Sequence, residues 1–184
     1  MEQSAGIYGF EVVPGQAHFN RYGDRIALHS KNVLVSVLVF GVDGKSGQMD
    51  KVTDQPVQPN GLCFTPDYKK LYIADTGSTR DITIWDVDGR TIRNGKRFVQ
   101  LDIPGSGAPS AADGIRCDVD GNVWAGARPG VQVITPGGER IGMIRMPETC
   151  ANICFGGGKR NRLFMAGSQS LYAVYVETIG AHIA

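Results

Sequence analysis

Three polar side chains occupy the same place in three similar stretches of the sequence: Asn60, Asp113 and Asn152. Each precedes a short apolar run, a polar turn and a second apolar run. One carboxylate and two amide oxygens, with no surrounding His or Cys cluster, are donors that suit a hard divalent cation such as calcium or magnesium. The pattern predicts a cation site if the fold brings the three residues together. The stretches are QPNGLCFTPDYKKLYIAD, AADGIRCDVDGNVWAGA and CANICFGGGKRNRLFMAG.

Two of these residues also have a simpler interpretation. Asn-Gly and Asp-Gly are the commonest hairpin dipeptides, so Asn60-Gly61 and Asp113-Gly114, taken singly, are more typical of turns than of ligands. Their recurrence in register favours a shared site. The spacings of 53 and 39 residues bracket the roughly 40 to 50 residues of a propeller blade, whose first strand lines a central channel. We therefore expect the three side chains to face one small volume.

The elements that must position these residues all have the pattern of β-strands. Val-Asp-Gly triplets at 42–44, 87–89 and 119–121 predict tight hairpins, and no segment shows sustained helical periodicity. We expect an all-β fold, a partial β-propeller of about three blades, in a single domain 1–184. Residues 1–40 are expected to be irregular or aberrant, and 41–177 to form the blades. Further predicted strands are Ile82–Val87, Lys96–Leu101, Val131–Thr135 and Ile141–Met146.

Composition restricts the partners. The 184 residues are 42% hydrophobic and 20% charged, with a formal charge of +1. A chain of this composition is typical of a globular protein, and its near-zero charge argues against nucleic acid and anionic membranes as partners. Residues 1–30 lack the pattern of a secretory signal, and no apolar run approaches the roughly 20 residues of a membrane helix. A cytoplasmic location is expected.

Other motifs have structural interpretations. The sequence DVDGN at 118–122 lacks the glycine and the closing glutamate of a calcium loop, which favours a hairpin turn. GGGKRN at 156–161 fits a connection between strands. There is no G-x-S-x-G, and only three histidines could serve as bases, so a serine hydrolase has little support. The four cysteines lack zinc-site spacing and are expected to be buried free thiols, at Cys63, Cys117, Cys150 and Cys154.

Taken together, the three stretches resemble the gluconolactonase, regucalcin and senescence-marker-protein family over about residues 40–176. The resemblance implies a six-bladed propeller with a divalent cation at the top of the channel, and hydrolysis of a small-molecule lactone to the hydroxy acid. It implies that Asn60 is a metal ligand and that Asp113 is both a metal ligand and the general base. Asn152 aligns with an inner-strand asparagine and is a candidate channel-lining residue. Calcium is the first candidate cofactor, with magnesium, zinc and manganese as alternatives.

The sequence departs from this family in two ways. The family's E-G-P glutamate, its first metal ligand, has no counterpart here, and the substrate-contacting Asn-Asp-Gly stretch is absent too. Six blades would need roughly 270 residues, so the chain resembles the C-terminal half only. Residues 17–39 fit neither the family nor a clean blade. The alternative function is a truncated, catalytically inactive paralogue that acts as a binding or structural module. Open blade edges also predict self-association.

Overall fold

The computed structural model describes residues 6–10, 18–19, 25–26, 38–43 and 46–182. Every regular element in this part of the chain is a β-strand, and the expected all-β fold is confirmed. The predicted irregular stretch at 17–39 lies mostly outside the described residues. None of the described segments is a helix long enough and apolar enough to cross a bilayer.

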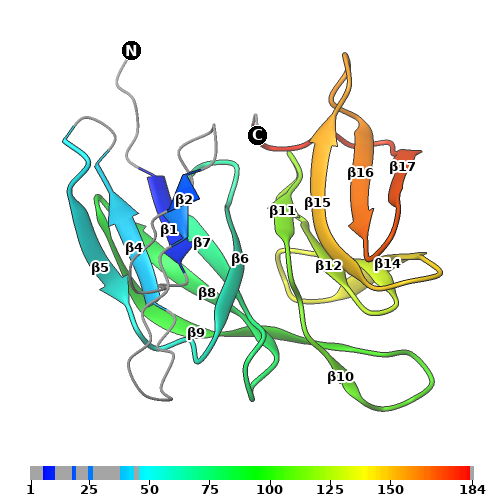
Figure 1. Ribbon diagram of the computed structural model, residues 1–184, viewed down its shortest axis with the longest axis horizontal. Coiled ribbons are helices and arrows are strands. Elements are labelled where there is room, and N and C mark those ends of the chain that lie inside the picture. Colours follow the sequence, from blue (N-terminus) through cyan, green and yellow to red (C-terminus); the bar gives the residue numbers. More distant parts are fainter. Residues whose placement is uncertain (1–5, 11–17, 20–24, 27–37, 44–45, 183–184) are drawn as a thin grey trace.

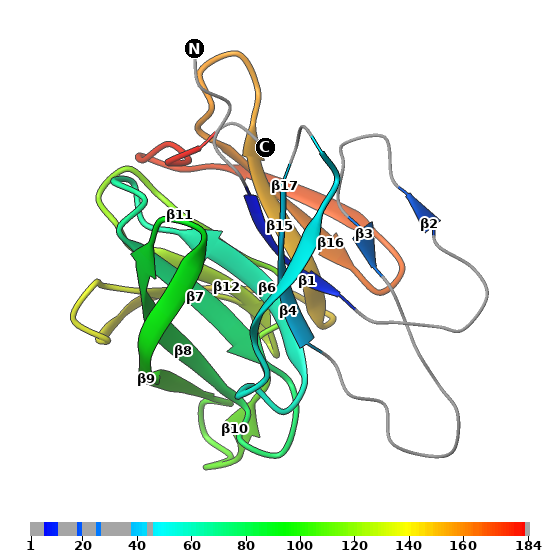
Figure 2. The ribbon, with the colours of Figure 1, turned by 90° about the vertical axis from the view of Figure 1, so that its left-hand side faces the viewer.

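The strands form four antiparallel sheets and one two-stranded ribbon, which follow one another along the chain (Figures 1 and 2). The first sheet has the order β1-β4-β5, with β1 at Gly6–Phe10, β4 at Leu38–Val42 and β5 at Met49–Thr53. The ribbon pairs β2 (His18–Phe19) with β3 (Arg25–Ile26).

The next three sheets are those expected from the recurring stretches. The second has the order β10-β9-β8-β7-β6, the third β11-β12-β13-β14 and the fourth β15-β16-β17. The strands of the second sheet are β6 (Pro59–Phe64), β7 (Lys70–Asp75), β8 (Asp81–Asp88), β9 (Thr91–Asp102) and β10 (Pro109–Ser110). Those of the third are β11 (Ile115–Cys117), β12 (Val123–Ala127), β13 (Gly130–Ile134) and β14 (Arg140–Arg145). Those of the fourth are β15 (Cys150–Gly156), β16 (Arg162–Gly167) and β17 (Leu171–Tyr175).

The first strand of each sheet lies beside the first strand of the next. β1 contacts β6, β6 contacts β11, and β11 contacts β15. The sheets therefore pack face to face around these inner strands, which is the arrangement of propeller blades. The chain leaves the inner strand of each of the last three sheets through hairpins, so each sheet is built from consecutive strands and its residues are local in sequence.

Three apolar clusters fill the spaces between neighbouring sheets. Successive side chains of a strand point to opposite faces, so a strand in a middle sheet buries both sets. On β7, Leu71 and Ile73 belong to the cluster facing the first sheet, whereas Tyr72 and Ala74 belong to the cluster shared with the third sheet. The third cluster joins the third sheet to Ile153, Leu163 and other residues of the fourth. This two-sided burial explains the continuous apolar runs in the sequence.

A buried aspartate organises the hairpin between β11 and β12. Asp118 is 1% exposed and accepts hydrogen bonds from the backbone of Asp120 and Asn122 and from the indole of Trp124. Gly121 closes the same turn with a φ of 83°, a value that favours glycine. The DVDGN stretch is thus a hairpin turn, as predicted. The GGGKRN stretch likewise connects β15 to β16.

The segment after β17 runs back across the ends of the inner strands. The amide of Val119 donates to the Ile179 carbonyl, and the amide of Ala181 donates to the Cys117 carbonyl. His182 reaches the carbonyl of Thr65 at 3.1 Å, and its ring lies 4.3 Å from that of Tyr68. The C-terminal segment therefore fastens the fourth sheet to the third and to the second.

Candidate functional site

Asn60 lies at the mouth of β6, where the strand separates from its own sheet. The pairing of β6 with β7 shifts register between Pro59 and Leu62, so Asn60 and Gly61 fall in the irregularity. The Gly61 amide instead donates to the carbonyl of Asp113, at 3.1 Å. A Cβ at Gly61 would overlap that carbonyl oxygen. The Asn-Gly pair is therefore part of a strand that closely approaches the next sheet, and not a hairpin turn.

The same device recurs one sheet further on. The Gly114 amide donates to the Ala151 carbonyl at 2.9 Å, and a Cβ at Gly114 would overlap the side-chain oxygen of Asn152. In both sheets the glycine that follows the polar residue allows two backbones to meet. The geometry places Asn60, Asp113 and Asn152 in consecutive positions along the row of inner strands.

Asp113 and Asn60 touch through their side chains. Burial raises the pKa of the Asp113 carboxyl above its ordinary value, and a hydrogen bond from the Asn60 side chain offsets part of that rise. Asp113 is half-buried, whereas Asn60 is exposed. The Asn60 amide donates this hydrogen bond through its nitrogen, so its oxygen remains available to coordinate a cation. A half-buried carboxylate beside an exposed amide oxygen can hold a cation or accept a proton.

We refer to Asn60, Asp113 and Asn152 as the three anchors. Asn152 differs from the other two. Its side-chain oxygen lies against Gly114 and accepts a hydrogen bond from the amide of Ile153 at 2.8 Å. Ile153 occupies the position that Gly61 and Gly114 fill in the preceding sheets, where the amide bonds to the next sheet. At the fourth sheet the side chain of Asn152 satisfies that amide. Asn152 is thus next to the Asp113 segment, with one oxygen lone pair already engaged.

Cys150 is a site neighbour that the sequence does not single out. It is fully buried, and its thiol donates a weak hydrogen bond to the Asn152 carbonyl at 3.5 Å. Burial raises its pKa to about 11, the bond to the Asn152 backbone lowers it, and the charge of Asp113 adds a smaller increase. A thiol with this pKa stays protonated at neutral pH, so it is not a nucleophile here.

The sequence also does not reveal the role of the two glycines. Taken singly, the two dipeptides are typical of turns, yet Gly61 and Gly114 permit the backbone contacts that bring the anchors together. The available signal was their repetition in register immediately after Asn60 and Asp113. A hairpin would place a turn at Asn60-Gly61 and at Asp113-Gly114. The tertiary structure instead shows that the two glycine amides bond to carbonyls of the next sheet.

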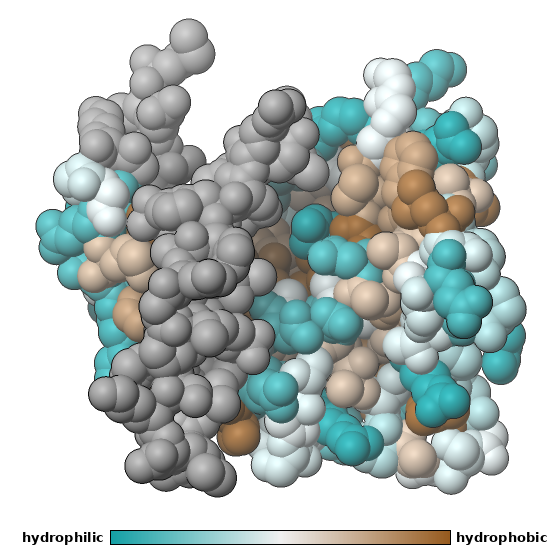
Figure 3. Space-filling view, in the orientation of Figure 1, coloured by the Kyte–Doolittle hydropathy of each residue, from teal (hydrophilic) through white to brown (hydrophobic). Residues whose placement is uncertain are grey.

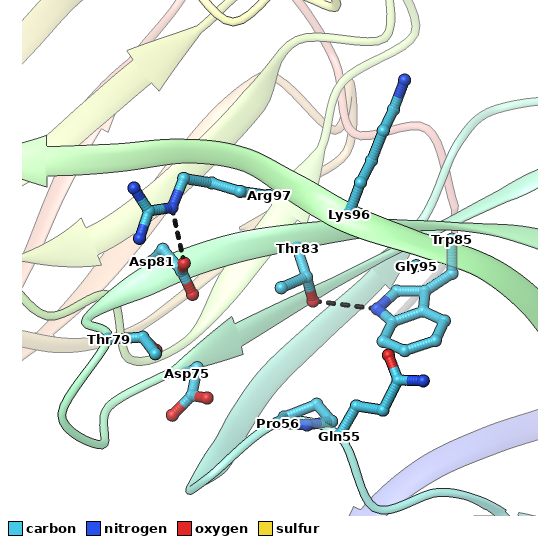
Figure 4. Close-up of a pocket in the computed structure, with 10 residues that line it drawn as sticks. All are labelled: Gln55, Pro56, Asp75, Thr79, Asp81, Thr83, Trp85, Gly95, Lys96 and Arg97. Atoms are coloured by element: carbon cyan, nitrogen blue, oxygen red, sulfur yellow. Dashed lines mark hydrogen bonds and ion pairs between the residues drawn. The ribbon is translucent and has the colours of Figure 1, made fainter.

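A separate pocket of about 190 Å³ lies on the second sheet, beside the segment that precedes β6 (Figure 4). None of the three anchors lines it. Arg97 pairs with Asp81 at 2.9 Å, and Asp75 accepts backbone hydrogen bonds from Val57, Gln58 and Gly77. The indole of Trp85 donates to the Thr83 hydroxyl, as Figure 4 shows. Both carboxylates of this pocket thus have structural partners, so the anchors remain the stronger candidate site.

The donor set at the anchors restricts the choice of cation. Within the described ranges, no group of three or more His, Cys, Asp and Glu side chains is placed to hold a metal. The anchors offer one carboxylate and amide oxygens, which suit a hard cation that retains several waters. Asp113 is also a partly desolvated negative group, which a cation would stabilise. The residues present therefore fit a hard divalent cation, held weakly.

The successive antiparallel sheets around a row of inner strands are the architecture of a β-propeller, and this chain forms part of one. The chain belongs to the family described as SMP-30/Gluconolactonase/LRE-like, whose family model matches residues 18–169. The family resemblance stated from the sequence is confirmed.

Individual relatives agree with this assignment. The gluconolactonase of Zymomonas mobilis is 29% identical over 140 residues, which are 73% of this chain and 39% of that protein. Lactonohydrolase oryL of Aspergillus oryzae is 28% identical over 177 residues, which are 83% of this chain and 40% of that protein. The chain therefore spans about two fifths of these curated relatives, consistent with a resemblance to one half of the family's length.

Solved structures support the fold. A gluconolactonase from Xanthomonas campestris superposes with a TM-score of 0.70 at 25% identity, covering 81% of this chain and 48% of that one. Regucalcin from Agrobacterium tumefaciens, a calcium-binding protein, superposes with a TM-score of 0.62 at 23% identity, covering 73% of this chain and 45% of that one. The second likeness bears on the fold alone. The prediction of a partial propeller is confirmed.

Proposed function

We propose that this chain carries the Asn60 and Asp113 part of a metal-dependent site that hydrolyses a lactone to its hydroxy acid. The observation that carries the proposal is the side-chain contact between Asn60 and the half-buried Asp113, at the mouths of two neighbouring inner strands. Membership of a family that includes gluconolactonases and lactonohydrolases supports the choice of substrate class. A cytoplasmic location stays a prediction.

The Asn60 side-chain oxygen and the Asp113 carboxylate would hold the cation. Calcium fits these oxygens, and magnesium, manganese and zinc are the alternatives. When bound, a divalent cation supplies Lewis-acid polarisation of a carbonyl oxygen. Two protein groups are few for such an ion, so we expect a dissociation constant in the millimolar range rather than the micromolar range, by comparison with weak calcium modules.

Asp113 acts as the general base in this proposal. Its carboxylate accepts a proton from the water that attacks the carbonyl carbon of the lactone. The ring C–O bond then breaks, and the departing oxygen takes up a proton, so that one lactone and one water give one hydroxy acid. Burial makes the carboxylate more basic than a solvated aspartate, which favours proton acceptance. Asn60 orients the carboxylate by donating to it.

Proton release from gluconolactone and a panel of small lactones tests this proposal. We expect background-corrected turnover with calcium, magnesium, manganese or zinc, and its loss on addition of chelator. Asp113→Asn should abolish turnover, because an amide retains the acceptor for Asn60 but cannot accept the proton. Asn60→Ala should reduce it by about 10-fold or more, in the range of a lost positioning interaction.

Asp120→Asn is the matched control. Asp120 is an exposed aspartate of an Asp-Gly pair in the hairpin between β11 and β12, and its backbone amide donates to the buried Asp118 of that turn. It should leave turnover unchanged. Background rates under every metal condition, or equal loss in Asp113→Asn and Asp120→Asn, would contradict the proposed hydrolase.

The second candidate function is a catalytically inactive, truncated propeller that acts as a binding or structural module. The exposed strand β17, with Leu171 and Tyr175 each 71% exposed, favours it, because large exposed apolar side chains in a row are typical of interaction surfaces. Calcium titration by calorimetry separates the two functions. Cation binding that Asp113→Asn abolishes, without turnover of any lactone, would favour the inactive module.

A further inference from the structure

Two cysteines from neighbouring sheets contact each other a few residues beyond Asn60 and Asp113. Cys63 lies on β6 and Cys117 on β11, and their sulfur atoms are 3.6 Å apart. The two residues are 54 positions apart in the sequence, so only the packing of the second sheet against the third brings them together. Both are free thiols.

The surroundings hold the two thiols in this position. Cys63 is paired with Tyr72 across the second sheet, and Cys117 with Val123 across the third. All four residues belong to one buried cluster. The Cys117 carbonyl also accepts the amide of Ala181, so the C-terminal segment braces β11 at this point. The packing of the two sheets therefore holds the backbones of the two cysteines close together.

We propose that Cys63 and Cys117 form a reversible disulfide when a hydroperoxide oxidises the protein, which links β6 covalently to β11. A disulfide bond of about 2.05 Å requires the sulfurs to approach by roughly 1.5 Å from their present contact. Rotation about the two Cα–Cβ bonds, with a small approach of the strands, supplies that movement. This inference does not depend on the proposed lactone hydrolysis.

The oxidation is balanced as two successive displacements. The thiolate of one cysteine attacks an oxygen of the hydroperoxide, the O–O bond breaks, and a sulfenic acid forms with release of water or an alcohol. The second thiol then attacks the sulfenic sulfur, the S–S bond forms, and a second water leaves. The two sulfurs together lose two electrons, and these electrons reduce the peroxide.

The rate of this reaction should depend on pH. Burial raises the pKa of the Cys63 thiol well above its ordinary value, and the facing Cys117 thiol adds to the effect. Because the thiolate is the reactive form, oxidation should be slow at pH 7 and accelerate towards pH 9. Both side chains are buried, with Cys63 7% and Cys117 4% exposed, which is a second reason to expect slow oxidation.

The link would act on the two strands that carry the anchors. Cys63 follows Asn60 by three residues, and Cys117 follows Asp113 by four. The disulfide closes a long loop, so it removes conformational freedom from the unfolded chain and should raise the midpoint of thermal unfolding by roughly 10 °C. It would also fix the distance between β6 and β11 at Cys63 and Cys117, a few residues beyond Asn60 and Asp113.

Peptide mapping of the full chain provides the test. The protein is treated with hydrogen peroxide at pH 7 and pH 9, remaining thiols are alkylated, and the digest is analysed without reductant. We expect a linked pair of peptides containing Cys63 and Cys117, lighter by two hydrogens, that disappears on reduction. A variant with both Cys150→Ser and Cys154→Ser keeps only the proposed pair and should lose both remaining thiols together.

Cys63→Ser and Cys117→Ser should each abolish the link and the thermal shift. Because these variants could also fold poorly, the wild-type map and the Cys150→Ser, Cys154→Ser variant decide the question. Recovery of Cys63 and Cys117 as separately alkylated peptides after peroxide treatment at pH 9 would overturn the proposal. Links between different chains, in place of the internal link, would overturn it as well.

Discussion

The third and fourth sheets of this protein have similar hairpins but very different surroundings. In the third sheet every residue of β12 and β13 is buried, because the second and fourth sheets cover its two faces. In the fourth sheet the outer strand β17 is exposed along most of its length. In Figure 3, brown and tan residues gather at the upper right of the view, in the region where β15–β17 lie in Figure 1, with teal residues around them.

This difference shows that a propeller blade depends on its neighbours for burial. The fourth sheet buries Leu163 and Met165 against the third, but its opposite face has no described sheet against it. On that face the Arg162 guanidinium lies 5.1 Å from the Phe164 ring and 5.6 Å from the Tyr175 ring. A charged side chain thus provides part of the cover that a neighbouring blade provides elsewhere.

The largest contrast is expected between two leucines of the fourth sheet. Leu163→Ala on β16 removes a fully buried side chain between two sheets, and we expect it to lower the free energy of unfolding by about 3 kcal/mol. Leu171→Ala on β17 removes a side chain that is 71% exposed, and the change should stay within about 0.5 kcal/mol. Urea unfolding measures both. Equal losses would show that the outer face of the fourth sheet is covered.

The next contrast is between the turns of the two sheets. Asp118→Ala in the third sheet leaves the buried indole of Trp124 and the part-buried amide of Asn122 without their acceptor, and we expect a loss of about 2 to 3 kcal/mol. Lys159→Ala, in the exposed connection between β15 and β16, should change stability by less than about 0.5 kcal/mol. Thermal and urea unfolding of both variants measure these values. A small effect of Asp118→Ala would mean that water replaces the carboxylate.

The exposed strand β17 should also determine association. Its residues Leu171–Tyr175 carry no charge, and an uncharged, apolar edge strand favours pairing with another chain. We expect sedimentation to show a mass that increases with concentration, and Tyr175→Lys to shift the protein towards the monomer by about tenfold in concentration. Ile141→Lys is the control, since Ile141 is 58% exposed on β14 of the third sheet. A monomer at every concentration would contradict the prediction of self-association.

The smallest effect is expected at the site itself. Burial raises the pKa of Asp113, so the folded state binds a proton more tightly than the unfolded state does. Stability from this group is therefore present at acidic pH and lost as pH rises through the carboxyl range. Asp113→Asn should raise stability at pH 7 by less than about 1 kcal/mol, because solvent screens a half-exposed group. Comparison of unfolding at pH 7 and near pH 3 should show the gain only at pH 7.

The sequence was a good guide to local structure. The predicted strands Ile82–Val87, Lys96–Leu101, Val131–Thr135 and Ile141–Met146 all fall within observed strands to within a residue or two. Trp85 and Trp124, which stand in strand-like runs of the sequence, are both buried. The four cysteines are free, and three of them are buried while Cys154 is partly exposed. These features follow from patterns of two or three neighbouring residues, which a sequence displays directly.

The site was only partly predictable. Repetition in register indicated that Asn60, Asp113 and Asn152 occupy equivalent positions, and the structure places them along adjoining inner strands. Their roles as ligand, base and channel-lining residue stay predictions. The sequence could not indicate that Ile153 bonds to Asn152 in place of a further sheet, because that depends on which sheet lies next in space.

By itself, the sequence determined the β-strands, their hairpins and the positions of the recurring polar residues, because alternating side chains and turn residues act over a few positions. Only the tertiary structure decided that Gly61 and Gly114 are sites of close backbone approach, that Cys63 meets Cys117, and that Asp113 is partly desolvated beside Asn60. Each of these depends on the packing of one sheet against the next. Such packing joins residues about 50 positions apart, and no local pattern encodes the distance between them.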